Sequence, residues 1–151
     1  MIVGSISDWA ERLMRGARVA HLATADQYAK PHVIPIVFVW RAPNLYTPLD
    51  AKPKQREDWH ALRRVRNIET NGRTSIVVDE YDEDWRRLAY VLLDGLATIL
   101  EAGEERDRAA AALAAKYPQY AALPLDGRPI VRVAVEHAVT WSASGVSASQ
   151  G

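Results

Sequence analysis

The chain has 151 residues, enough for about one domain that buries a sizeable core. Hydrophobic residues make up 48% and charged residues 25% of the sequence, values ordinary for a folded protein, which exclude a mostly disordered or collagen-like chain. Nineteen basic and nineteen acidic residues give a formal net charge of zero, so the overall charge favours neither nucleic acid nor an anionic membrane as a partner.

The sequence contains no cysteine, which excludes disulfides, thiolate catalysis and cysteine-bound zinc. Near the start of the chain, Asp8 and Glu11 interrupt the apolar run that a signal peptide needs, and no stretch approaches 18 apolar residues. We therefore expect a cytoplasmic protein without a membrane partner. We also expect a single domain over residues 1–141 and a flexible tail over residues 142–151.

The first half of the chain is typical of one helix followed by strands. The opening helix has apolar residues spaced near 3.6, a serine cap at Ser5 or Ser7, and a stop near Gly16. Alternating β-branched and aromatic residues then predict three strands, joined by short turns and therefore paired in sequence order. These strands cover residues 18–24, 32–40 and 45–47.

The second half mixes helices with longer strands. A loop with two prolines over residues 48–58 leads into an apolar stripe of helical spacing that begins at Trp59 and ends before Asn71-Gly72. Asp94-Gly95 marks either a hairpin turn or a bulge in one long strand, and both interpretations stay open on this pattern. The other predicted elements are a strand over 74–80, a polar connector over 81–87, apolar strand material over 88–100, a helix over 104–117 and final strand material over 129–141.

These elements predict a mainly β protein of the β-barrel or α+β class. Six or seven antiparallel strands with about three connecting helices fit a barrel whose helices pack at its ends. Closing the sheet removes open edges, but side chains fill a barrel of this size. A large ligand must therefore lie outside the barrel.

The highest density of charged residues lies between Lys52 and Arg73, a segment that contains seven basic and three acidic residues. Such a run is usually a solvated surface. Here, however, Lys52 and Lys54 follow a strand while Arg63, Arg64 and Asn67 lie on the next helix, so donors from loop and helix can converge on one anion such as a phosphate. Neither a GxxxxGK nor a GxGxxG motif is present, which excludes the common nucleotide loops.

Other chemistry finds little support in the sequence. The four histidines form no close pair, so we expect no metal, and no GxSxG elbow supports a hydrolase. The pattern names no catalytic residue. Trp85 is unusual because it lies among charged residues, where an aromatic side chain is often half buried but can also cover a planar ligand or a partner chain.

Four segments together are similar to one known family. RVAHLATADQYAKPHVIPIVFVW, LYTPLDAKPK, LRRVRNIETNGRTSIVVD and YVLLDGLATIL occur in the order strand, strand, basic loop, RxxN helix and strand. This order resembles the pyridoxamine 5′-phosphate oxidase-like split-barrel flavoproteins, and within them the branch that uses coenzyme F420. The resemblance covers residues 17–142 and favours a bulge at Gly95 over a hairpin.

The resemblance implies a homodimer with the cofactor on the outer face of the barrel at the dimer interface. It places the isoalloxazine-type ring along the second strand, at Pro35, Ile36 and Val37. Tyr81 and Trp85 are our candidates for residues that reach across to the partner chain. The positions that the resemblance assigns to the cofactor phosphate are Thr47, Pro48, Lys52, Lys54, Arg63, Arg64 and Asn67.

One departure from the family bears on the cofactor. The RxxLLK phosphate motif of true pyridoxamine phosphate oxidases is absent, and the loop before Leu62 is long and basic. A deazaflavin with an anionic tail needs such an extended positive path, whereas FMN ends at its phosphate. We therefore expect coenzyme F420 and hydride transfer to a small unsaturated or imine-like substrate. The alternatives are an FMN-dependent oxidase or reductase, a non-catalytic flavin, deazaflavin or haem binder, and a structural barrel that binds no small molecule.

Overall fold

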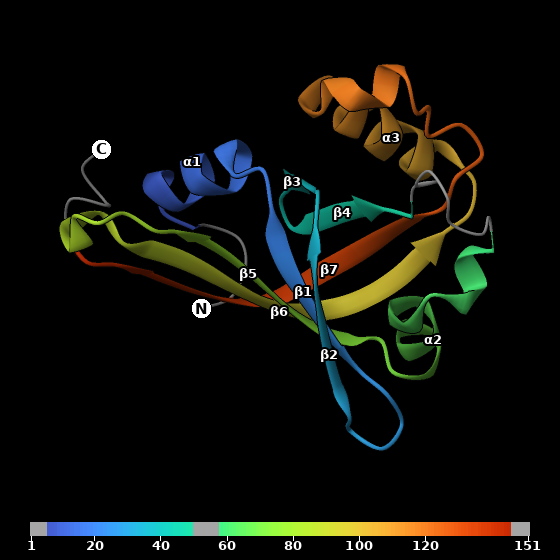
Figure 1. Ribbon diagram of the computed structural model, residues 1–151, viewed down its shortest axis with the longest axis horizontal. Helices are drawn as coiled ribbons and strands as arrows, with labels where there is room; N and C mark the ends of the chain where they lie inside the picture. Colours follow the sequence, from blue (N-terminus) through green and yellow to red (C-terminus); the bar gives the residue numbers. More distant parts are fainter. Residues whose placement is uncertain (1–5, 50–57, 146–151) are drawn as a thin grey trace.

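The computed structural model describes residues 6–49 and 58–145. Among these residues, no helix is long and apolar enough to cross a membrane. Figure 1 shows a strongly curled sheet with helices around it. The helices are α1 (Asp8–Gly16), α2 (Arg63–Thr70) and α3 (Glu104–Lys116), and the strands are β1 (Ala20–Ala25), β2 (Pro31–Ile36), β3 (Val39–Arg41), β4 (Asn44–Pro48), β5 (Arg73–Glu80), β6 (Ala89–Leu100) and β7 (Ile130–Ser142).

The described strands form one antiparallel sheet in the order β2-β1-β5-β6-β7-β4-β3. Its two outermost strands, β2 and β3, are consecutive in the chain and only residues 37 and 38 separate them. The sheet must therefore curl until its ends approach each other, which gives a split, half-barrel shape. The predicted mainly β class, with seven antiparallel strands and three α-helices over the described residues, is confirmed.

The two faces of the sheet differ because successive side chains of a strand point to opposite sides. Leu22, Ile76, Leu93 and Ala138 lie opposite one another on β1, β5, β6 and β7, and each is at most 1% exposed. They belong to the main core, onto which α1 and α2 pack. A second apolar cluster lies beneath α3, around Leu113 and Ile130.

The predicted single strand over residues 32–40 is wrong, because the chain leaves the ladder at Val37 and Phe38 and divides into β2 and β3. The backbone of Phe38 bonds to side chains at the end of α3 instead. Its amide donates to the Tyr117 hydroxyl (3.1 Å), and its carbonyl accepts from Lys116 Nζ (3.0 Å). Because residues 78 and 79 positions away supply these bonds, the strand pattern could not reveal the break.

At Gly95 the chain forms a bulge within one long strand. β6 pairs with β7 along its whole length, and the register shifts by one residue between Asp94 and Gly95. A Cβ at Gly95 would lie 2.4 Å from the carbonyl oxygen of Ala134, so only glycine fits here. The bulge that the resemblance favoured is thus confirmed and the hairpin excluded.

Two further boundaries differ from the sequence pattern. The predicted helix from Trp59 begins as a separate 3₁₀ turn over Trp59–Ala61, capped by the Asp58 carboxylate, and α2 starts only at Arg63. The final strand material is one continuous strand that extends to Ser142. Residues 146–151 of the expected tail lie outside the described part of the chain.

Candidate functional site

A cleft on the outside of the barrel lies between the ends of β2 and β4 and the start of α2. Its volume is about 150 Å³. Six of the residues that the family resemblance assigned to the cofactor line it together with Val19, although they come from three separate elements or their ends. These six are Pro35, Ile36, Val37, Thr47, Pro48 and Arg64.

The cleft combines apolar and polar walls. Pro35 is exposed and Val37 half-buried, so the end of β2 and the residue that follows it offer apolar surface without a charge. Across the cleft, the lining includes Thr47, a buried residue of β4, and Arg64 at the start of α2. An apolar flat group with one anionic end matches this donor set, because the guanidinium binds phosphate oxygens through paired charge-assisted bonds.

The start of α2 carries an unusual concentration of positive charge. Arg63 and Arg64 occupy the first turn, which contains no acidic residue, although the positive end of the helix dipole disfavours cations there. Burial, followed by the charges of Arg63 and Arg64, lowers the pKa of His32 on the neighbouring strand β2. A bound anion would relieve this excess positive potential.

Arg63 and Asn67 are not part of the cleft lining. The hydrogen bond from the Lys30 backbone amide is the main cause that lowers the pKa of Asp26, and the positive charge of Arg63 lowers this pKa by a smaller amount. Asn67 is buried, and its side-chain amide donates to the Thr24 hydroxyl at 3.0 Å. This bond fastens α2 to β1, so Asn67 supports the position of Arg64. Lys52 and Lys54 lie outside the described residues.

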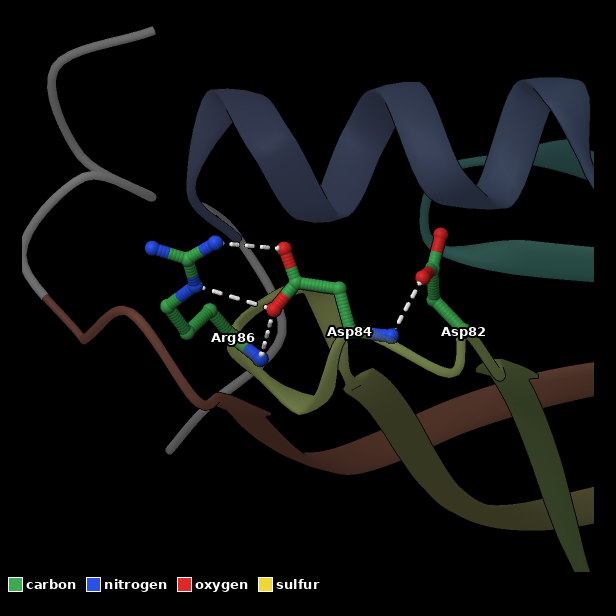
Figure 2. A network of polar contacts seen from close by, with 3 residues as sticks. All are labelled: Asp82, Asp84 and Arg86. Atoms are coloured by element: carbon green, nitrogen blue, oxygen red, sulfur yellow. Dashed lines mark hydrogen bonds and ion pairs between the residues drawn. The ribbon is translucent and has the colours of Figure 1, made fainter.

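Tyr81 and Trp85, the expected partner-chain residues, lie at the tip between β5 and β6, at the opposite end of the molecule from α2 (Figure 1). Both are about two thirds exposed, at 65% and 67%. Figure 2 shows the polar contacts at this tip. The Arg86 guanidinium donates two hydrogen bonds of 2.9 Å to the Asp84 carboxylate, and the Asp82 carboxylate accepts a hydrogen bond from the Asp84 amide. Within one chain these aromatic side chains do not reach the cleft.

The sequence did not reveal a second hollow, which adjoins the cleft. It lies between α1 and the strands β1 and β5 and has a volume of about 740 Å³. Val19 lines both this hollow and the cleft. The hollow combines residues that are far apart in the chain, so no local motif could have indicated it.

A third hollow, of about 630 Å³, lies between α1, β3 and α3. Lys116 lines it beside Ala115, and burial lowers the pKa of Lys116 to about 8. Its ammonium group also lies 4.0 Å from the centre of the Phe38 ring. The contacts of Lys116 to Phe38 hold the break between β2 and β3, which gives this residue a structural role.

The curled antiparallel sheet with α-helices around it defines a class of small split-barrel proteins. Over residues 6–142 the chain matches the pyridoxamine 5′-phosphate oxidase family, and it belongs to that family. No curated protein matches the chain in sequence.

Solved structures of low sequence identity share the fold. The conserved hypothetical protein Rv2991 from Mycobacterium tuberculosis has a TM-score of 0.74 at 18% identity, covering 97% of this chain and 89% of that one. The haem storage protein HutZ from Vibrio cholerae has a TM-score of 0.68 at 18% identity, with coverages of 87% and 90%. An FAD-binding protein from Mesorhizobium loti has a TM-score of 0.64 at 22% identity, with coverages of 93% and 97%.

Proposed function

We propose that the protein is an oxidoreductase that binds coenzyme F420 in the outer cleft and uses it to reduce a small unsaturated or imine-like substrate. The observation that carries this proposal is the convergence of an apolar wall with Thr47 and Arg64 at one cleft. Family membership supports the oxidoreductase class, and the FAD-binding structural relative supports a flavin-like ligand.

Each side of the cleft has its own task in this proposal. Pro35, Ile36 and Val37 would lie along the ring and exclude water from one of its faces. Thr47, Pro48 and Arg64 would hold the phosphate, with the first turn of α2 adding its positive dipole end. When bound, the reduced cofactor supplies a hydride, so the protein itself has to orient the reactants rather than provide a nucleophile.

We expect coenzyme F420 to bind more tightly than FMN and to lose affinity more steeply as salt is raised. The extended anionic tail would meet the positive charges between Lys52 and Arg66, and salt screens charges that face solvent over about 8–10 Å at physiological ionic strength. Competition titrations at two salt concentrations measure both effects. If FMN binds more tightly at low salt, where the tail has its greatest advantage, the FMN-dependent alternative replaces this proposal.

The cofactor site in this proposal is completed by a second copy of the chain. One protomer offers a cleft of about 150 Å³, whereas small-molecule pockets usually span about 300–1,000 Å³. A two-fold dimer is the commonest way to add a second wall. Tyr81 and Trp85 are exposed and remote from the cleft of their own chain, which suits residues that act across an interface.

The outward face of the sheet is the surface that we assign to this dimer. Tyr90 and Trp141 stack on it with ring centres 5.7 Å apart, and Val139 and Val33 add exposed apolar surface at 39% and 64%. The strand register places Val139, Leu92, Val77, His21 and Pro35 in one row across it. That row ends at Pro35, in the wall of the cleft, so a partner on this face would also approach the cofactor.

Replacing Trp141 by glutamate should therefore convert the dimer to a monomer, because it places a charge in the centre of an apolar contact. Light scattering at micromolar concentration measures the mass. Leu123→Glu is the matched control, since Leu123 is similarly exposed at 41% but lies outside the sheet. A parent protein that is monomeric with cofactor bound would contradict the dimer.

A further inference from the structure

A fourth hollow, between α3 and the strands β3 and β4, has the volume of a small-molecule site. This volume is about 770 Å³, and small-molecule pockets usually span about 300–1,000 Å³. Figure 1 shows α3 beside the two strands that form the opposite wall. Among the described residues, none lines both this hollow and the proposed cofactor cleft. We call it the α3 hollow.

The acidic residue in the lining of the α3 hollow, Glu105, is already paired. One of its carboxylate oxygens accepts a hydrogen bond of 2.7 Å from the Tyr46 hydroxyl, and the other accepts one of 2.8 Å from the Arg132 guanidinium. Tyr46 lies opposite Arg132 in the β4–β7 ladder, so the sheet holds both donors in place. The negative charge of Glu105 is therefore balanced by Arg132.

Two arginines in the same lining lack a comparable partner. The side chain of Arg41 forms no hydrogen bond or ion pair with any other residue that the structure describes, and Arg41 is exposed. Arg108 lies 3.6 Å from Glu104, but these side chains are 72% and 94% exposed, and surface pairs of this kind stabilise little. The α3 hollow therefore has an excess of positive charge that an anion would balance.

The spacing of the two arginines indicates the shape of this anion. Arg41 lines both the α3 hollow and the third hollow, together with Ala112 and Ala115. Arg108 comes four and seven residues before these alanines, which is about 6–10 Å along the helix axis. Ala111 and Ala112 lie between the two positions, and their methyl groups offer apolar surface without filling the space. A ligand that matches has an anionic group at each end and an apolar chain in the middle.

We propose that the α3 hollow binds a linear dicarboxylate, with one carboxylate at Arg41 and the other at Arg108. Each guanidinium can donate two parallel, charge-assisted hydrogen bonds to a carboxylate, because the two planar groups match in shape. The chain between the carboxylates lies along the alanines of α3 and removes their apolar surface from water. This site requires neither the cofactor nor a second copy of the chain, so its test is independent of the proposed function.

Suberate and octanoate test the ligand class, because they have the same chain length and differ by one carboxylate. In a titration of the protein without cofactor, millimolar suberate should shift the backbone amide resonances of Arg41, Ala111 and Ala112. Octanoate should bind at least about tenfold more weakly, because it leaves one arginine without a partner. Equal affinities for the two compounds, shifts confined to other parts of the chain, or no shifts at all would overturn the proposal.

Removing each arginine tests the two ends of the site. Arg41→Gln and Arg108→Gln should each raise the Kd of suberate by about tenfold, because each variant loses one charge-assisted contact. Arg15→Gln is the matched control, since Arg15 is exposed and lines the third hollow but not the α3 hollow. It should change this Kd by less than about twofold. A loss in Arg15→Gln as large as that in Arg41→Gln, or an unchanged Kd in Arg41→Gln and Arg108→Gln, would contradict the proposal.

A bulky side chain tests the middle of the site. Ala111→Phe places a ring on the helical wall of the α3 hollow, and Ala114→Phe places the same ring on α3 outside the lining. Both alanines are exposed, so neither variant should disturb the core, and thermal unfolding checks this. Ala111→Phe should weaken suberate binding by about tenfold or more, and Ala114→Phe should leave it within about twofold. Equal suberate affinities in these two variants would show that the ligand does not lie along this wall and would refute the proposal.

Discussion

Replacing Arg64 by alanine should weaken cofactor binding about tenfold to a hundredfold without unfolding the protein. Arg64 lines the cleft beside Thr47 and Pro48, where its guanidinium would make a charge-assisted bond to the cofactor phosphate. Such a bond contributes about 1.5–3 kcal/mol, and every 1.4 kcal/mol corresponds to about a tenfold change in Kd. Titrating the variant with coenzyme F420 and with FMN measures the loss, and thermal unfolding checks that the fold is intact.

Arg66→Ala provides the matched control for this variant. Arg66 lies on the same helix, is exposed, and is not part of the cleft lining. It should therefore change affinity only through the screened charge of the surface, by less than about 1 kcal/mol. Equal cofactor affinities in the Arg64 variant, the Arg66 variant and the parent would show that the basic segment is an ordinary solvated helix face without a role in cofactor binding.

Replacing Gly95 by alanine should destabilise the fold by about 1–3 kcal/mol, the usual cost of forcing extra atoms into a packed interior. The added Cβ would lie 2.4 Å from the Ala134 oxygen and 3.0 Å from a methyl group of Val133. Because backbone atoms of β7 form this contact, it can be relieved only by separating the two longest strands. Urea unfolding at equilibrium measures the change through the transition midpoint.

Gly16→Ala is the control, since a Cβ at this position meets no atom within 4 Å and the backbone there is not left-handed. It should leave stability unchanged or raise it by about 0.4–1 kcal/mol, because alanine restricts the unfolded chain. A Gly95→Ala variant as stable as the parent would show that the bulge relaxes at little cost. Its role would then be to set the strand register rather than to stabilise the fold.

Much of this protein could be predicted from its sequence because the signals are local. Period-2 alternation within β1, β5 and β7 reflects one buried and one outward face, and the charged, alanine-rich helix α3 agrees with its own propensities. The resemblance to the split-barrel family added the bulge at Gly95. It also named six residues that the fold brings to one cleft, although whether they bind a cofactor stays a prediction.

The features that escaped prediction depend on contacts between distant segments. Residues 32–40 have the pattern of one strand. The strand is interrupted because the Phe38 backbone forms hydrogen bonds with the side chains of Tyr117 and Lys116 at the end of α3, instead of pairing with a neighbouring strand. The sequence marks Asn67 as a polar helix residue, but its burial and its bond to Thr24 follow from the packing of α2 on β1. The hollow beneath α1 is lined by residues of α1, β1 and β5, which are far apart in the chain.

The sequence by itself therefore determined the strand content, the basic segment and the class of barrel, since each of these depends on neighbouring residues. Only the tertiary structure decided where β2 ends. It also decided that Val19 lines both the cleft and the hollow beside α1. The same holds for the outward face that Trp141 shares with Tyr90. The physical reason is that backbone bonding and cavity walls depend on how the sheet curls, and this curl brings together side chains that no sequence window contains.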